Sequence, residues 1–253
     1  MKTAQFWYMG LRRPEDFRDP GVVRPFLEAL VKRGFILLDL WGEEKKRFFH
    51  LWVGLLFLPE RPAVRELTEQ EREALLEPRI WPELEERLRR FFSEPLDPQQ
   101  RVAIDIYAAA REGELKGLDW GFTLYCPADE EEEVPAEMAY AWVTEQFLNT
   151  NGKRGFWEVE LPLLLYRYWR PLVVYLREET ERPLPRGEDE RVEIRYLYRE
   201  NLYSAEVVER LGRERLKETP GARVEELEGG GLWLHVYRRE EAMAYLGLEQ
   251  PVW

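Results

Sequence analysis

The first strong hydrophobic pattern in the chain has the spacing of an amphipathic helix. Asp19 can cap the free N–H groups of that helix, and Pro20 suits the first helical position. Pro25 removes one hydrogen bond, so two helix starts remain open, Pro20 and Pro25. Gly34 is predicted to end the helix. The apolar positions recur every three or four residues and form one stripe: Val22, Val23, Phe26, Leu27, Leu30 and Val31.

Four later segments have the pattern of β-strands. Residues 34–41 and 48–58 are continuous apolar runs rich in aromatic and branched side chains, which predicts two paired strands covered on both faces. Residues 98–113 alternate at first and then become rich in alanine, so a strand followed by a turn is favoured over a helix. Residues 117–127 are predicted to form another strand.

Further helices are predicted from caps and from residue spacing. Thr68 begins a capping-box pattern, and Pro82 opens a short amphipathic segment. The clearest helical stripe of the chain follows Pro135. Its apolar positions would share one helix face: Met138, Ala139, Trp142, Val143 and Phe147.

Three consecutive glycines, Gly229 to Gly231, suit either a phosphate-binding loop or a turn. A phosphate loop requires a helix after the glycines, so that its N–H groups and its positive end meet the anion. The residues that follow alternate in the manner of a strand: Leu232, Leu234 and Val236 against Trp233, His235 and Tyr237. We therefore predict a hairpin turn, in which glycine supplies positive φ angles, and no nucleotide site.

These elements together predict an α+β protein with a mainly antiparallel sheet and helices packed on one side. We expect one compact unit over residues 1–253, with a possible subdivision near 113–117. Only residues 156–177 resist assignment, because this segment is rich in aromatic residues throughout. Its prolines, Pro162 and Pro171, should interrupt any single long element.

Composition describes a folded protein without covalent cross-links. The 253 residues are 45% hydrophobic and 34% charged and include 10 Trp, 12 Tyr and 12 Phe, which excludes a disordered chain. Cys126 is the only cysteine, so an intramolecular disulfide and a four-thiolate metal site are excluded. The excess of arginine over lysine and the many prolines indicate a thermophilic protein. The first residues hold no apolar segment of the length that a signal peptide needs, and no run reaches the length of a membrane span, so we expect a cytoplasmic protein.

The chain is strongly acidic. A formal net charge of −12 argues against DNA or RNA as a direct ligand, because phosphate binding uses a basic surface. An acidic surface instead attracts basic proteins. We name the densest charge cluster the acidic block: Asp129, Glu130, Glu131, Glu132 and Glu133. It suits a solvated loop beside the positive end of the helix predicted after Pro135, or a docking patch for a basic partner, and both interpretations stay open.

Candidate catalytic residues are few. His50 lies in an apolar run and is best explained as a packed side chain, and His235 shares a strand face with Trp233 and Tyr237. Two histidines poorly supply a zinc site, and Cys126 is best explained as a buried thiol on a strand. The many carboxylates show no diagnostic spacing for acid–base catalysis or for magnesium. We predict no catalytic residue, no metal ligand and no cofactor.

The C-terminal part of the chain carries a resemblance to a known family. The similarity lies in the order of parts over Asn201–Val236: Leu202 before a short helix, the sequence ERLG at Glu209 to Gly212, Leu216, the sequence PGARVEEL at Pro220 to Leu227, and the glycine-rich hairpin. In this order the segment resembles the end of bacterial type VI immunity proteins associated with VRR-NUC nuclease effectors. Leu118 to Pro127, followed by the predicted helix, is similar in placement to the middle of those proteins.

The resemblance implies a protein that blocks a toxin by binding it. Nuclease toxins bind phosphates and present cationic clefts, which an inhibitor with surplus carboxylates can occupy. We therefore expect an immunity-type protein, not an enzyme, whose partner is a basic nuclease toxin and whose contact residues are the acidic block. The alternatives are an enzyme that acts on a small substrate through carboxylates, and a scaffold protein of a larger assembly.

Overall fold

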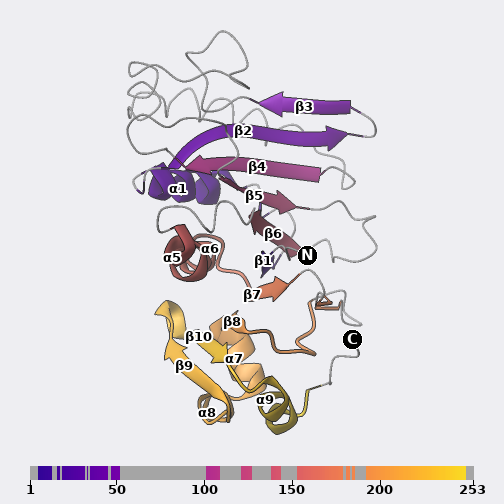
Figure 1. The fold of residues 1–253 in the computed structure, drawn as a ribbon, viewed down its shortest axis with the longest axis vertical. Coiled ribbons are helices and arrows are strands. Elements are labelled where there is room, and N and C mark those ends of the chain that lie inside the picture. Colours follow the sequence, from indigo (N-terminus) through magenta and orange to yellow (C-terminus); the bar gives the residue numbers. More distant parts are fainter. Residues whose placement is uncertain are drawn as a thin grey trace.

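A computed structural model shows one sheet of ten strands with helices packed against it (Figure 1). The structure describes residues 5–12, 16–17, 19–31, 33, 35–44, 47–51, 101–108, 121–126, 138–143, 153–178, 181–182, 184–185 and 192–248. The strands are β1 (Gln5–Gly10), β2 (Phe35–Glu44), β3 (Arg47–Leu51), β4 (Arg101–Ala108), β5 (Gly121–Cys126), β6 (Met138–Val143), β7 (Val173–Glu178), β8 (Glu200–Tyr203), β9 (Ala222–Glu226) and β10 (Leu232–Val236). The helices are α1 (Pro20–Val31), α5 (Lys153–Gly155), the π-helix η3 (Phe156–Glu160), α6 (Leu161–Trp169), α7 (Ala205–Leu211), α8 (Arg213–Lys217), the 3-10 turn η4 (Glu228–Gly230) and α9 (Arg239–Leu246).

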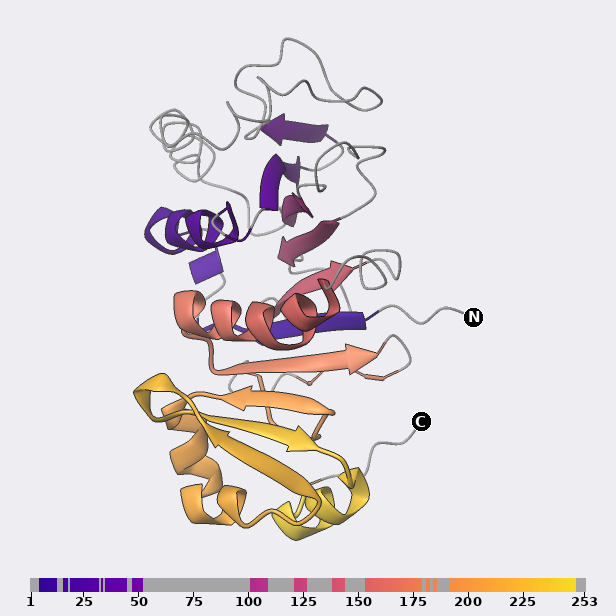
Figure 2. The same cartoon turned by 60° about the vertical axis from the view of Figure 1, so that its left-hand side comes forward.

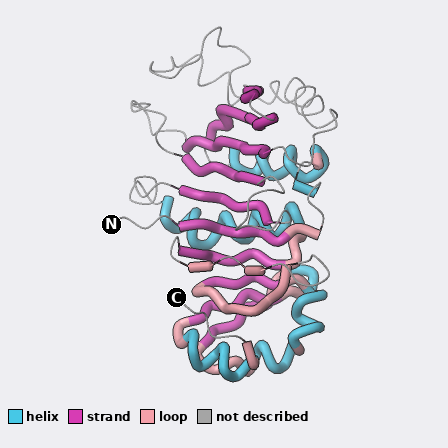
Figure 3. The backbone as a smooth tube through the Cα atoms, turned by 90° about the vertical axis from the view of Figure 1, so that its right-hand side faces the viewer, coloured by secondary structure: helices cyan, strands magenta, loops and turns pink. Residues whose placement is uncertain are grey.

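The strands follow the order β3-β2-β4-β5-β6-β1-β7-β8-β10-β9. Every neighbouring pair is antiparallel. The first strand, β1, lies between β6 and β7 and so joins strands β2 to β6 with strands β7 to β10 in one sheet (Figure 3). The predicted α+β class and antiparallel sheet are confirmed, as are the strands predicted within residues 34–41, 48–58, 98–113 and 117–127.

Successive side chains of the strands point to opposite faces of the sheet and pack in two separate hydrophobic cores. Trp7 and Met9 of β1 pack in the core that contains α1, η3 and α6, whereas Tyr8 packs in the core that contains α7, α8 and α9. The helices therefore divide between the two faces, which differs from the expectation of helices on one side. The second core forms because β10 also turns apolar side chains to that face, Leu232 and Leu234 among them. Figure 2 shows the α5–η3–α6 helix lying along the sheet and the C-terminal helices at its lower end.

The prediction of a helix after Pro135 is wrong for the part of that segment that the structure describes, Met138–Val143. Met138–Val143 form strand β6, which pairs with β1 on one side and β5 on the other. Ala139 and Ala141 are buried opposite Met9 and Trp7, so these small residues face large ones across the strand pair. The apolar residues of this segment fit the two-residue period of a strand as well as the helical period. Pairing with a strand on each side makes the segment a strand.

The segment that resisted assignment contains a helix followed by a strand. Pro162 lies in the first turn of α6, where the preceding backbone is a π-helix, because proline cannot donate to the regular helical ladder. Pro171 lies between α6 and β7, so this proline does separate two elements as predicted. Arg170 ends α6 in the left-handed region with φ 46°.

The remaining local predictions have mixed outcomes. Helix α1 starts at Pro20 and contains Pro25, so the earlier of its two possible starts is correct. Asp19 accepts a hydrogen bond from the N–H of Gly21 at 2.8 Å, as expected of a capping residue. The helices predicted at Thr68 and Pro82 lie outside the described residues. In the part of the chain that the structure describes, no helix has both the length and the apolar character needed to cross a membrane.

The glycine triplet is a hairpin turn, as predicted. It joins β9 to β10, which pair in continuous register from Ala222↔Val236 to Glu226↔Leu232. Gly229 and Gly230 adopt φ 78° and 83°, conformations that glycine reaches without steric cost. Gly231 has an ordinary φ but lies directly against Tyr166 and Tyr203. Gly229 and Gly230 are therefore needed for their positive φ angles, and Gly231 is needed because a side chain would not fit.

Candidate functional site

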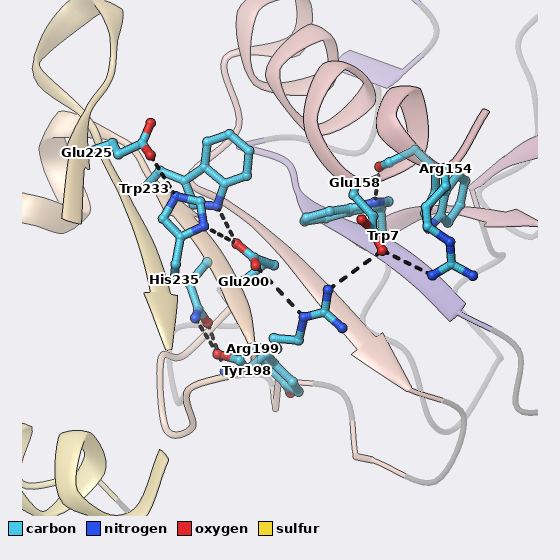
Figure 4. A network of polar contacts seen from close by, with 11 residues as sticks. Trp7, Arg154, Glu158, Tyr198, Arg199, Glu200, Glu225, Trp233 and His235 are labelled. Atoms are coloured by element: carbon cyan, nitrogen blue, oxygen red, sulfur yellow. Dashed lines mark hydrogen bonds and ion pairs between the residues drawn. The ribbon is translucent and has the colours of Figure 1, made fainter. Parts of the chain in front are cut away.

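A network of polar contacts lies on the last strands of the sheet (Figure 4). We name this group the Glu200 cluster: Glu158, Arg199, Glu200, Glu225 and His235. Strand pairing places Glu200 opposite His235, across β8 and β10. It also places Glu225 of β9 opposite Trp233 of β10. The antiparallel register therefore brings two carboxylates and one imidazole to the same sheet face.

Glu200 is the centre of the cluster. Its Oε2 lies 2.7 Å from Nδ1 of His235 and accepts a hydrogen bond from Trp233 Nε1 at 2.8 Å. The side chain is only 15% exposed. Burial therefore raises the pKa of Glu200 above its ordinary value of 4.5, although the nearby His235 and the Trp233 hydrogen bond both act to lower that pKa.

His235 is held between two carboxylates and an aromatic ring. Its Nε2 lies 3.3 Å from Oε1 of Glu225, and its ring centroid lies 4.5 Å from that of Trp233 at 30°. The sequence predicted that His235 shares a strand face with Trp233, and their ring contact confirms this, whereas Tyr237 follows the end of β10 and is 69% exposed. Because the two carboxylates occupy opposite ring nitrogens, they cannot share one metal ion with the imidazole. No metal-binding group of three or more ligands occurs among the described residues.

Ion pairs extend the cluster from the strands to the covering helix. Arg199 Nη2 lies 3.7 Å from Oε1 of Glu158, and Arg199 Nε lies 3.9 Å from Oε1 of Glu200. Arg154 pairs with Glu158 at 3.3 Å. The contacts thus run from η3 to β8 and β10. These contacts hold the last strands in register and tie them to the covering helix.

Replacing Glu200 by glutamine should change how stability depends on pH. The raised pKa means that the folded state binds a proton more tightly than the unfolded state, so this carboxyl lowers stability as pH rises from its ordinary pKa of 4.5 through its folded pKa. Glu200→Gln removes that loss and keeps an acceptor oxygen. The free energy of unfolding of the variant relative to the wild type should therefore increase with pH.

Urea unfolding at several pH values between 4 and 7 measures this difference. Glu228→Gln is the matched control, because the Glu228 side chain is 87% exposed. The control should show no comparable rise. A difference between Glu200→Gln and wild type that stays constant or falls with pH would contradict the assignment.

The acidic block lies outside the described residues. In the sequence, Asp129 to Glu133 fall between β5 and β6, which are neighbouring strands. One interpretation placed these carboxylates at the positive end of a helix after Pro135. That interpretation loses its basis, because Met138–Val143 form a strand without a comparable dipole. The docking interpretation stays a prediction.

His50 and Cys126, the other residues considered from the sequence, lie on strands that are several positions away from β8 and β10 in the sheet. His50 of β3 is opposite Trp41 of β2, and Cys126 ends β5 opposite Val102 of β4. The strand predictions at both positions are confirmed. The structure brings neither residue to His235, because several strands separate β3 and β5 from β10.

Sequence reasoning missed Glu200. The residue lies 35 positions before His235, in a segment whose composition resembles the many other charged stretches of the chain. The signal was available only through pairing of β8 with β10, which skips the intervening strand β9. A prediction of strand order would have been needed to find it.

A second candidate lies between the helices of the first core. A groove of about 570 Å³ is lined by residues of α1 and of the C-terminal end of α6. Both acidic and basic side chains line it, among them Asp19, Arg167 and Arg170. Asp19 is already engaged by Gly21, and Arg167 lies 3.9 Å from Glu228. The groove therefore has no single charge preference.

Comparison with known proteins finds structural likeness at low sequence identity. No family model matches the chain, and no curated protein matches it. A solved structure described as "Pseudomonas aeruginosa T6SS protein PA0821" is similar with a TM-score of 0.42 and 11% identity, and the match covers 92% of this chain. The chain spans 65% of the length of that protein. That description names the type VI secretion system and mentions neither a toxin nor a VRR-NUC nuclease.

Proposed function

We propose that this protein is an immunity-type protein that neutralises a basic toxin, a nuclease, by stoichiometric binding in the cytoplasm. It acts by covering the toxin and transforms no substrate. The observation that carries the proposal is the resemblance over Asn201–Val236, in a chain whose net charge is −12.

The order of parts in that segment has a physical counterpart in the fold. Ser204 caps α7 by accepting from the N–H of Val207, two residues after Leu202 in β8. Gly212 joins α7 to α8 with φ 90°. Strand β9 and the glycine hairpin then return the chain to pair with β10 beside β8. Each resembling motif thus corresponds to one capping, turning or pairing position in a continuous unit.

Charge explains how such a unit would meet its partner. A nuclease cleft that binds phosphate is cationic, so a carboxylate-rich inhibitor gains fast, steered association with it. We assign this contact to the acidic block. Rim charges contribute little affinity alone, and an aromatic centre is needed as well. Tyr237, 69% exposed, and Tyr245, 40% exposed, are the exposed aromatic residues among those that the structure describes.

Replacing the acidic block tests the contact. Substitution of Asp129 to Glu133 by serine or glutamine should weaken toxin binding by at least about tenfold at low salt, since several steering charges are removed. The affinity of the variant should also depend less on salt. Isothermal titration calorimetry against the toxin encoded by the neighbouring reading frame, at two salt concentrations, measures both effects.

A matched control removes the same charge elsewhere. It replaces five exposed carboxylates of the C-terminal helices and their flanks by glutamine: Glu209, Glu214, Glu218, Glu240 and Glu241. The control should bind nearly as the wild type does. Equal losses in both variants would show a general charge effect, and an unchanged affinity in the acidic-block variant would overturn the contact. Failure of the wild type to protect cells that co-express the toxin would overturn the function itself.

A further inference from the structure

Strand β9 is the last strand in the order of the sheet, so half of its backbone groups point away from its one partner strand, β10. The N–H of Leu227 donates to Gly231 O, and that of Tyr237 donates to Gly221 O, both at 2.9 Å. Hydrogen-bonded pairs alternate along an antiparallel ladder, so β9 uses its odd-numbered residues to bond β10. The even-numbered residues turn their N–H and C=O groups outward: Ala222, Val224 and Glu226. No hydrogen bond from any described residue reaches those groups.

An open edge is a template for another strand, and sheets usually protect it. Proline and bulges are two common protections. β9 contains no proline, and its register with β10 shows no shift. Charged side chains are the remaining protection, at Arg223, Glu225 and Glu226. The sign and order of these charges therefore decide what the edge repels.

The charges of β9 do not repel a second β9. In an antiparallel pair centred on Val224, each Val224 lies opposite its copy, and each Arg223 lies opposite Glu225 of the other chain. Ala222 then lies opposite Glu226. The Val224 pair and both Ala222–Glu226 pairs use outward-facing groups, so each can exchange two hydrogen bonds. Arg223 and Glu225 project on the same face, because they already form an ion pair at 2.6 Å within one strand.

Neighbouring registers are unfavourable. A shift of the centre to residue 223 places Arg223 opposite Arg223, and a shift to residue 225 places Glu225 opposite Glu225. Like charges directly opposite each other destabilise a strand pair. Among these three registers, only the one centred on Val224 combines outward-facing backbone groups with opposite charges.

We propose that β9 is the interface of a homodimer, in which the β9 strands of two copies pair antiparallel about a two-fold axis at Val224. The surface is isologous, as a closed two-fold dimer requires. The two sheets then form one continuous sheet across the interface. The partner is a second copy of this chain, because Arg223 and Glu225 of one β9 strand match Glu225 and Arg223 of the other in charge.

The dimer should be weak. A single five-residue strand pair buries less than the roughly 1,200 Å² of a standard interface, so we expect a dissociation constant on the order of 10–100 µM. Sedimentation velocity from about 1 to 500 µM, a range that brackets this constant, should show the chain moving from 30.4 kDa toward twice that mass.

Two kinds of variant test the pairing. Val224→Pro removes one outward N–H from each copy and leaves the β9–β10 bonds intact, as proline does on an edge strand. It should weaken dimerisation at least about tenfold, whereas Val224→Thr, which keeps the N–H, should not. Arg223→Glu places like charges opposite each other and should also give a monomer. Adding Glu225→Arg to that variant restores opposite charges and should restore the dimer.

Arg238→Glu is the charge control, because Arg238 is 70% exposed and lies outside β9. It should dimerise as the wild type does. Circular dichroism establishes that each variant is folded, and the exposed Arg223 substitution keeps the test valid if Val224→Pro unfolds the chain. A wild type that stays monomeric at about 500 µM, well above the expected constant, would overturn the proposal. So would a double variant that fails to recover the dimer.

Discussion

Replacing Gly231 by alanine should destabilise the protein by about 3 kcal/mol, near the upper end for overpacking a closed site. A Cβ at this position would overlap the Tyr166 hydroxyl and would lie 2.5 Å from the backbone oxygen of Tyr203. The hydroxyl can move, but the strand oxygen cannot move without disturbing β8. Chemical denaturation of Gly231→Ala and wild type measures the difference.

Gly229→Ala is the matched control within the same turn. Its Cβ would meet no atom within 4 Å, but its φ of 78° is unfavourable for alanine. This variant should lose about 1 kcal/mol from backbone strain alone. If Gly229→Ala is as damaging as Gly231→Ala, or more so, packing against Tyr166 and Tyr203 is not the reason for the third glycine.

Replacing Asn201 by leucine should lower the free energy of unfolding by about 3 kcal/mol, because two buried backbone groups lose their hydrogen-bond partner. Asn201 is 1% exposed. Its Oδ1 accepts from the N–H of Tyr198 at 3.0 Å, and its Nδ2 donates to the carbonyl of Tyr198 at 2.7 Å. The side chain thus satisfies both backbone groups of one residue and fixes the turn into β8.

Asn201→Asp separates the two bonds. The aspartate keeps the acceptor for the Tyr198 N–H but loses the donor, so its loss of stability should grow as pH rises and the carboxylate ionises. Thermal unfolding at pH 4 and pH 7 measures that trend. If Asn201→Leu loses less than about 1 kcal/mol, water or a rearranged turn satisfies Tyr198 instead.

The sequence predicted elements well wherever one period dominated. The alternation after Gly231 could only suit a strand, and the hairpin is confirmed. Met138–Val143 suited both periods, and the choice depended on β1 and β5, which lie far away in the sequence. Local pattern cannot contain that information.

The candidate site was less predictable than the fold. The alternation placed His235 and Trp233 on one strand face, but the contact of His235 with Glu200 depends on the pairing of β8 with β10. The raised pKa of Glu200 arises from burial, which no residue spacing reports. The outward-facing edge of β9 likewise became visible only once the hydrogen-bond ladder was known.

We propose that this acidic protein acts by covering a basic nuclease toxin, and titration of the purified toxin with the protein tests this while nuclease activity is followed. Nuclease activity should fall linearly to zero at one equivalent of the protein and return when high salt dissociates the complex. Inactivation by far less than one equivalent, or full activity in the presence of excess protein, would contradict it.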